Sequence, residues 1–201
     1  KEVCYLLNQD SLMTEGGTLT SGRSQQLILQ IILGSLLISM FLISISSSAN
    51  PIPHEPITIM GNSDFTPSNG VSSGTGDSED PYIIEGFVIK ISSGIGVEIS
   101  NTSRHFLLRN ITITGDLTWS SIGVRYDNIK WGNSSDISVT KVGIGMTLNK
   151  TAYCTITDCS ISAQRMGLYS FCGVLNSFSG NTIWFEGTGE PHEAGIILSD
   201  D

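Results

Sequence analysis

Charged residues are scarce in this chain, and basic residues are the scarcest. Only 14% of the 201 residues are charged, with 10 Lys and Arg against 19 Asp and Glu, which gives a formal net charge of −9. No stretch of the sequence gathers Lys and Arg into a basic stripe. Proteins that bind nucleic acid neutralise its phosphates with clustered Lys and Arg. The composition therefore excludes nucleic acid as a partner.

Helical periodicity is missing from the second half of the chain, where a glycine motif repeats instead. Five glycines there each sit between two apolar residues, at intervals of 27, 22, 22 and 28 residues. No period near 3.6 residues runs through these segments, which argues against helical repeats. Repetition of this kind predicts a solenoid. The glycines are Gly96, Gly123, Gly145, Gly167 and Gly195.

Strand geometry assigns the residues around each glycine to two faces. Side chains alternate with period two along a strand, so the residues one before, one after and three after each glycine are expected to face inward. The glycine and the residue two after it are expected to face outward. At that outward position, Glu98 and Arg125 predict a surface ion pair between neighbouring coils. One inward column is predicted to contain Ile95, Ile122, Ile144, Met166 and Ala194.

A second pattern supplies the remaining strands. Residues 106–113 match residues 154–161 in their alternation, at an offset of 48, and the alternation slips by one residue at a polar corner. The corner residues are Asn110, Asp158 and Gly180. Three short strands per coil of about 22 residues predict an all-β chain, folded as a right-handed parallel β-helix, which is a single-stranded solenoid. The alternative, a β-sandwich, has no reason to keep one register through five copies.

Residues 56–201 resemble the right-handed β-helix repeat family that includes pectate-lyase-like and NosD-like proteins. The run Asp80-Pro81-Tyr82-Ile83-Ile84-Glu85-Gly86, with the Gly-, Ser- and Asn-rich residues 57–76 before it, resembles the opening segment of large archaeal surface proteins with β-helix ectodomains. The resemblance implies the fold and a location outside the cytoplasm. It fixes no activity, because one fold hosts many functions.

The first fifty residues predict export. Residues Leu27–Ile45 are almost continuously apolar, over a length that can span a bilayer. The small residues Ser47-Ser48-Ala49 that follow suit cleavage by signal peptidase. Four segments are expected. Residues 1–26 are a leader, or in part upstream sequence if the protein starts at Met13, and residues 27–49 are a signal peptide or membrane anchor with a helical apolar run. Residues 50–81 are a linker and N-terminal cap, and residues 82–201 are β-helix coils that continue beyond Asp201.

Covalent cross-links and glycans are predicted at few positions. Cys154 and Cys159 fall at inward positions, where cysteine serves as a small apolar residue. A bridge from either of them to Cys172 is an open alternative, since export allows disulfides. Four Asn-x-Ser/Thr sequons are candidate glycosylation sites, at Asn101, Asn110, Asn133 and Asn149.

Two sets of residues are candidates for ligand binding. Asp77, Glu79 and Asp80 fall together in a Gly- and Ser-rich stretch and offer the oxygen donors that suit Ca²⁺. Their spacing matches no EF-hand, so a solvated acidic loop is the alternative. Trp119 and Trp131 fall in predicted loops of the coil that carries an insertion, where exposed aromatic rings can stack on sugars. No cofactor other than Ca²⁺ is expected.

No catalytic residue is assigned. Asp200 and Asp201 are adjacent carboxylates, as in some polysaccharide hydrolases, but their partners would lie beyond residue 201. We expect a non-catalytic module of a secreted or cell-surface protein, structural or adhesive. Its expected partners are extracellular polysaccharide or other surface proteins, and the membrane through the N-terminal segment. The alternatives are a polysaccharide lyase, hydrolase or epimerase with a site partly beyond residue 201, and a NosD-like copper-maturation accessory protein, although no Met- or His-rich ladder occurs.

Overall fold

A computed structural model describes residues 51–185 and 194–199 of the chain. All of these belong to one compact unit, residues 49–201. The expected leader at 1–26, the expected signal peptide or anchor at 27–49, and the Asp200–Asp201 pair lie outside the described residues. Within the described ranges, no helix has the length and hydropathy of a transmembrane span.

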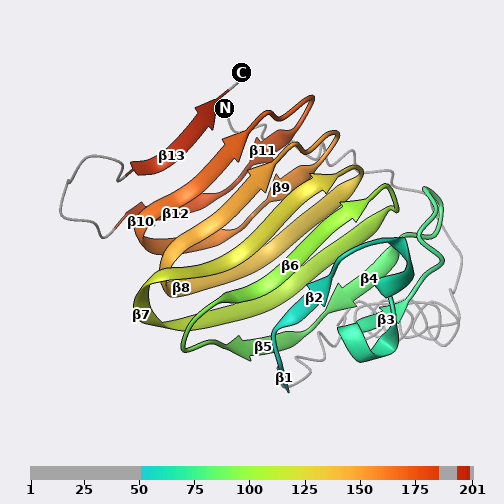
Figure 1. The fold of residues 1–201 in the computed structure, drawn as a ribbon, viewed down its shortest axis with the longest axis horizontal. Helices are drawn as coiled ribbons and strands as arrows, with labels where there is room; N and C mark the ends of the chain where they lie inside the picture. Colours follow the sequence, from blue (N-terminus) through green and yellow to red (C-terminus); the bar gives the residue numbers. More distant parts are fainter. Residues whose placement is uncertain (1–50, 186–193, 200–201) are drawn as a thin grey trace, which may run out of the picture. The chain divides into compact units, whose positions relative to one another are not determined.

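The described residues form a β-solenoid of about five turns. Successive strands pair in parallel from one turn to the next, and Figure 1 shows the turns lying side by side in chain order. One antiparallel pair, β3 with β4, lies near the N-terminal end. The strands are β1 (Ile52–His54), β2 (Ile57–Ile59), β3 (Val71–Ser73), β4 (Tyr82–Glu85), β5 (Phe87–Lys90), β6 (Ile95–Thr102), β7 (Phe106–Ile129), β8 (Gly132–Asn149), β9 (Thr155–Thr157), β10 (Ser160–Phe171), β11 (Ser177–Ser179), β12 (Thr182–Phe185) and β13 (Ala194–Ser199).

The corners of the turns explain how one long strand can bend around the core. Asn110, Asp136 and Asp158 have positive φ angles of 51°, 53° and 52°, and Gly180 follows at 65°. Asn, Asp and Gly are the residues that adopt this left-handed conformation most readily. One such residue shifts the in–out alternation by one position, so the predicted slip at a polar corner is confirmed.

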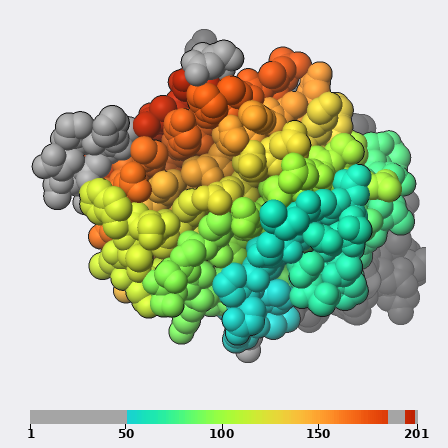
Figure 2. All heavy atoms as spheres, viewed as in Figure 1, coloured from blue at the N-terminus to red at the C-terminus, as the bar shows by residue number. Residues whose placement is uncertain are grey.

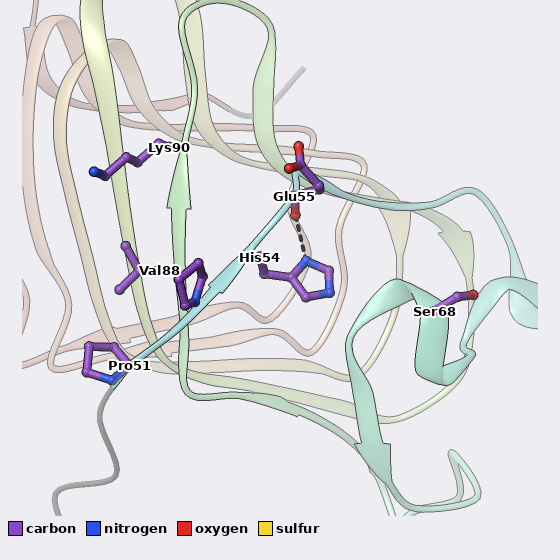
Figure 3. Close-up of a pocket in the computed structure, with 7 residues that line it drawn as sticks. Pro51, His54, Glu55, Ser68, Val88 and Lys90 are labelled. Atoms are coloured by element: carbon purple, nitrogen blue, oxygen red, sulfur yellow. Dashed lines mark hydrogen bonds between the residues drawn. The ribbon is translucent and has the colours of Figure 1, made fainter.

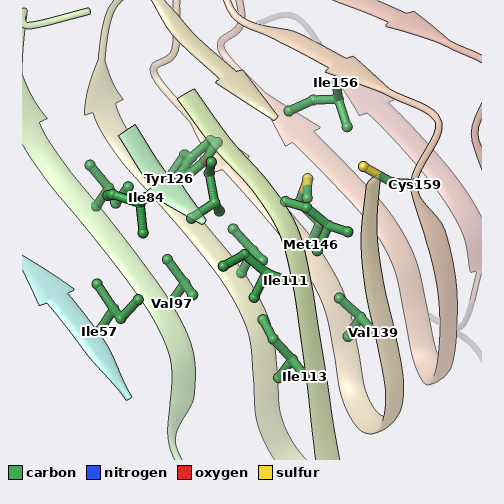
Figure 4. Packing of buried hydrophobic residues seen from close by; sticks show 14 of the residues in the cluster. Ile57, Ile84, Val97, Ile111, Ile113, Tyr126, Val139, Met146, Ile156 and Cys159 are labelled. Atoms are coloured by element: carbon green, nitrogen blue, oxygen red, sulfur yellow. The ribbon is translucent and has the colours of Figure 1, made fainter. Parts of the chain in front are cut away.

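The core is a set of apolar columns that run from turn to turn (Figure 4). In one of them Ile89, Ile113, Val139 and Ile161 occupy the same register position and each is 0% exposed. Burial of this kind stabilises the fold by about 25 cal/mol per Å² of apolar surface. The core therefore lies in the interior that each turn encloses, as the sequence pattern predicted.

Tyr126 is the one large polar side chain at the centre of this core among the described residues. Its hydroxyl lies 2.6 Å from the Ser134 hydroxyl oxygen, and its ring meets Phe106 edge-on at 5.5 Å between centroids. Desolvation raises the pKa of Tyr126 well above its usual value, and the hydrogen bond with Ser134 acts in the opposite direction. Tyr126 therefore stays neutral and acts as a satisfied core residue.

The predicted column of residues before the glycines does stack. Ile95 pairs with Ile122, Ile122 with Ile144, Ile144 with Met166, and Met166 with Ala194. The predicted outward orientation of the glycines is wrong. A Cβ on Gly123, Gly145 or Gly167 would overlap a core side chain of another strand and a glycine carbonyl of the next turn.

The inward glycine displaces the residue before it from the core. Ile122 is buried, but Ile95, Ile144 and Met166 are only half-buried. The side chain of Ala194 lies outside the described atoms. The residue after the glycine, such as Val124 at 0% exposure, lies fully in the core.

Residues 52–73 pack onto the first turn. The expected linker contributes β1 and β2, which pair in parallel with β5 and β6. Two short 3₁₀ turns follow, η1 (Asn62–Asp64) and η2 (Pro67–Asn69). Between them Phe65 is buried and stacks on Tyr82, with 4.5 Å between ring centroids.

Candidate functional site

The glycine-motif strands present one continuous outward surface, which we call the motif face. It is formed by β6, the parallel segments 122–129, 144–149 and 166–171 of β7, β8 and β10, and β13. In Figures 1 and 2 its strands follow one another from green at β6 to red at β13.

Polar side chains on the motif face pair between turns. Arg125 Nη1 lies 3.4 Å from Glu98 Oε1, which confirms the predicted ion pair. Asn149 donates from Nδ2 to Asp127 Oδ1 at 2.8 Å. These contacts link neighbouring turns, and the polar groups that form them are not available to bind a ligand. Exposed ion pairs of this type contribute on the order of 0–1 kcal/mol.

Trp119 lies at the edge of the motif face, in a bulged segment of β7. The pairing of β7 with β8 shifts register on both sides of Thr118, and we call residues 115–121 the Trp119 bulge. The sequence predicted a loop here, whereas the backbone stays in the sheet with an irregular register. The Trp119 side chain is 55% exposed.

Hydrogen bonds hold the Trp119 bulge in place. Thr118 Oγ1 donates to the Ser92 carbonyl at 2.7 Å, and Ser121 Oγ donates to the Thr118 carbonyl at 2.6 Å. The Gly143 N–H of the next turn donates to Ser121 Oγ at 3.1 Å. A Cβ on Gly143 would overlap the Trp119 carbonyl, so the glycine lets the bulge lie directly against β8. The exposed ring is thus carried by a fixed backbone, which lowers the ordering cost of binding.

Arg165 lies over the Trp119 ring. Its guanidinium carbon is 5.1 Å from the ring centroid, within the range of a cation–π contact. The sequence patterns did not single out Arg165, because the bulge reaches across an intervening turn to meet it. The spacing of 46 residues is close to two repeats of 22, which is the only signal that could have suggested the contact.

Trp131 has its ring faces covered. It stacks on His105 of the preceding turn, with 5.2 Å between centroids, and on Tyr153 of the following turn, at 4.3 Å. Both pairs are within 13° of parallel. A sugar could therefore reach the edge of Trp131 but not its faces without displacing a neighbour. The interval of 22 residues between Trp131 and Tyr153 is the repeat length, so this stack could have been foreseen.

The structure does not bring the two predicted sugar-stacking residues together. Trp119 precedes the motif-face segment 122–129 of β7, and Trp131 follows it. They stand at opposite edges of the motif face. Trp119 is 55% exposed and has Arg165 over its ring, whereas Trp131 is 37% exposed and stacks on a ring of each neighbouring turn. The larger exposure favours Trp119 as the platform for a sugar.

The predicted Ca²⁺ ligands do not converge. Asp77 forms an ion pair with Arg104, with 3.1 Å between Oδ1 and Nη1. Asp77, Glu79 and Asp80 are all exposed. In residues 51–185 and 194–199, no group of three or more His, Cys, Asp or Glu side chains is arranged to hold a metal ion. The arrangement fits the alternative of a solvated acidic loop.

Three of the four sequons are exposed. Asn101, Asn110 and Asn133 lie at the surface, where a glycan could be attached. Asn149 is half-buried and donates its hydrogen bond to Asp127. Accessibility therefore favours the first three as glycosylation sites.

Cys154, Cys159 and Cys172 are free thiols. The open alternative of a bridge to Cys172 is not realised. Burial raises the pKa of the Cys154 and Cys159 thiols, against the effect of hydrogen bonds with backbone groups. A buried thiol of raised pKa is a poor nucleophile, so these two side chains are core residues, as their inward positions predicted.

A shallow hollow of about 620 Å³ lies beside β1 (Figure 3). His54, Glu55, Ser68 and Lys90 contribute its polar side chains. The His54 ring packs on Phe87 at 4.4 Å between centroids, and its Nδ1 lies 2.6 Å from the Glu55 carbonyl oxygen. This local hydrogen bond fixes the ring. Sequence patterns gave no sign of the hollow, because it forms only when β1 joins β5.

Comparison with known proteins does not assign the chain to a family. No family model matches the chain, and no significant similarity to a curated protein or to a solved structure is found. The fold and its surface features therefore carry the functional argument.

Proposed function

We propose that this chain is an exported, non-catalytic module of a cell-surface or secreted protein that binds glycans through Trp119. The single observation that carries the proposal is the exposed Trp119 ring, held on a hydrogen-bonded bulge at the edge of the motif face. An aromatic ring presents a large rigid apolar surface, which suits the C–H face of a sugar. The coils are proposed to be right-handed, as in the β-helix repeat proteins that the sequence resembles.

Some acidic residues in the described part of the chain are held in ion pairs, which supports a binding role without catalysis at those positions. Glu85, Glu98 and Asp77 each pair with an arginine. Catalytic acids and bases need to be within hydrogen-bond reach of a bound substrate and free to exchange protons. The buried groups with raised pKa, Tyr126, Cys154 and Cys159, face the core, where no substrate can reach them.

The proposal that the chain is exported is based on its sequence. The apolar run Leu27–Ile45 and the small residues after it support a signal peptide or an anchor. The Ser-, Thr- and Asn-rich outer surface with exposed sequons supports a location where glycans are added and encountered. The membrane through the N-terminal segment, extracellular polysaccharides and other surface proteins are the proposed partners.

A polysaccharide screen tests the proposal. The purified chain is incubated with neutral and acidic polysaccharides, with and without Ca²⁺, and both binding and product formation are measured. We expect binding without cleavage, and Trp119→Ala should weaken it by about tenfold, since ring stacking contributes roughly 1 kcal/mol or more. Trp184→Ala is the matched control, because Trp184 is also exposed, at 63%, but lies on β12. Turnover of any polysaccharide, or equal losses in both variants, would contradict the proposal.

A further inference from the structure

A second outward surface of the solenoid carries hydroxyl side chains in a regular array, and we call it the hydroxyl face. Two residues after each polar corner, one hydroxyl side chain occupies the same register position in four consecutive turns. The four are Thr112, Ser138, Ser160 and Thr182. The strands that present them follow one another in the sheet in the order β7, β8, β10 and β12.

A second column of hydroxyls lies beside the first. Thr114 and Thr140 come two residues further along β7 and β8, where they pair with each other in the same register as the first column. Of the six side chains, Thr112, Ser160 and Thr182 are exposed and the others are half-buried. All six therefore reach the surface, and they extend the array in two directions, across the turns and along the strands.

The inward residues of the same strands hold this array in place. Ile113, Val139 and Ile161 alternate with the hydroxyl positions and are each 0% exposed, in register from turn to turn. Alternation along a strand turns the hydroxyls to the opposite side, and a β-branched side chain such as that of threonine has few rotamers. The hydroxyls therefore keep a fixed spacing of about 4.8 Å between turns and about 6.6 Å along a strand.

Long side chains stand at the two ends of the hydroxyl face. Lys90 of β5 pairs with Thr114 in the first turn of the face, and Trp184 lies on β12 in its last described turn. Between these ends the outward positions of residues 112–114 and 138–140 all carry hydroxyls. The other outward surfaces are interrupted by ion pairs between turns. The short side chains of the hydroxyl face thus form the more regular surface.

We propose that the hydroxyl face binds the surface of ice. A serine or threonine hydroxyl both donates and accepts hydrogen bonds, so each can hold a water molecule, and waters held by a regular array repeat at the spacing of the array. The two spacings of the hydroxyl face are close to the repeats of the oxygen atoms along the two axes of a prism plane of hexagonal ice. Water ordered in this way can join the ice lattice. The inference goes beyond glycan binding and does not depend on it.

Partition into growing ice tests the proposal. An ice crystal is grown slowly through a dilute solution of the full 201-residue chain, and the concentration of the chain in the ice is compared with that in the remaining liquid. Growing ice excludes a solute that does not bind its surface, so serum albumin at the same concentration is the control. We expect the chain to be enriched in the ice and albumin to stay in the liquid.

Variants locate the binding surface. Thr140→Lys places a long charged side chain in the middle of the array and should abolish the enrichment. Thr147→Lys makes the same change at another half-buried threonine of β8, on the motif face, and should leave the enrichment intact. Ser160→Lys changes an exposed position of the next turn, so it repeats the test if Thr140→Lys fails to fold. Thermal unfolding followed by circular dichroism checks each variant.

Three results would overturn the inference. The first is exclusion of the unaltered chain from ice, as for albumin. The second is enrichment that survives Thr140→Lys or Ser160→Lys in a folded variant. The third is an equal loss in Thr147→Lys, because the effect is then not specific to the hydroxyl face. Each of these results leaves the proposed glycan binding at Trp119 unaffected.

Discussion

At the scale of single residues, the repeat is enforced by a few backbone positions. Four of the motif glycines, Gly96, Gly123, Gly145 and Gly167, lie where the space for a side chain is filled by an apolar side chain of another strand and a glycine carbonyl of the next turn. The corner residues Asn110, Asp136 and Asp158 tolerate positive φ. These two requirements, repeated in each turn, are what keeps the chain in one register.

A pair of glycine variants tests this account. Gly145→Ala should lower the free energy of unfolding by about 1–3 kcal/mol, because the added methyl group overpacks the core. It would overlap Ile161 and the Gly167 carbonyl oxygen. Gly195→Ala occupies the same motif position, but a Cβ there meets nothing within 4 Å among the described atoms, so it should be nearly neutral. Denaturant unfolding of both variants measures the difference, and equal losses would refute an inward-facing glycine.

The sequence predicted the repeat and the corner but not the orientation of the glycine. Alternation places Gly145 outward if the strand is regular, whereas a Cβ on Gly145 would overlap the core side chain of Ile161 in the neighbouring turn. A period along the chain does not encode this contact between turns. The stack of Trp131 on Tyr153 is encoded in the repeat length, yet whether its ring faces are covered depends on the packing of His105.

At the scale of elements, the Trp119 bulge is the feature that separates this surface from a plain solenoid. It spans residues 115–121, between two regular stretches of β7, and it carries the exposed indole. Ser121 is 0% exposed; its Oγ donates to the Thr118 carbonyl within the bulge and accepts a hydrogen bond from the Gly143 N–H of β8. The insertion was visible in the sequence as a longer interval, but its path against Gly143 and toward Arg165 was not, since no repeat partner shares it.

Ser121→Ala should loosen the bulge. The change leaves the buried Gly143 N–H without its acceptor, which costs about 1–3 kcal/mol, and frees the Thr118 carbonyl. We expect a lower midpoint of unfolding and weaker glycan binding, without any change to the indole itself. Ser120→Ala is the control, because Ser120 is exposed. If both variants bind glycan as the unaltered chain does, a fixed bulge is not needed for the site.

At the scale of the whole described unit, stability should vary along the solenoid. Each turn contacts its neighbours, so β8 is held on one side by β7 and on the other by β10. In β13, Ile196 and Leu198 are 58% and 63% exposed. In a repeat protein, the stability of a turn is approximately its intrinsic free energy of folding plus the interface free energies that it shares with its neighbouring turns.

Hydrogen exchange measures this variation. Backbone amides of β8 should exchange at least tenfold more slowly than those of β12 and β13, a factor that corresponds to about 1.4 kcal/mol of opening free energy. The same experiment reports the register, because the protected amides should be those of the parallel ladder. Uniform protection from β2 to β13 would show that the unit opens as one body, and it would contradict a turn-by-turn solenoid.

The central claim is that Trp119 is the residue that meets a glycan. The chain contains three tryptophans, Trp119, Trp131 and Trp184, so a ¹⁵N-labelled sample gives three indole N–H signals that single substitutions assign. Titration with an oligosaccharide of the polymer that binds best should shift the Trp119 signal, leave Trp184 in place and move Trp131 little, because Trp131 is stacked between His105 and Tyr153. A saturating titration that shifts Trp131 or Trp184 and leaves Trp119 unmoved would contradict the claim.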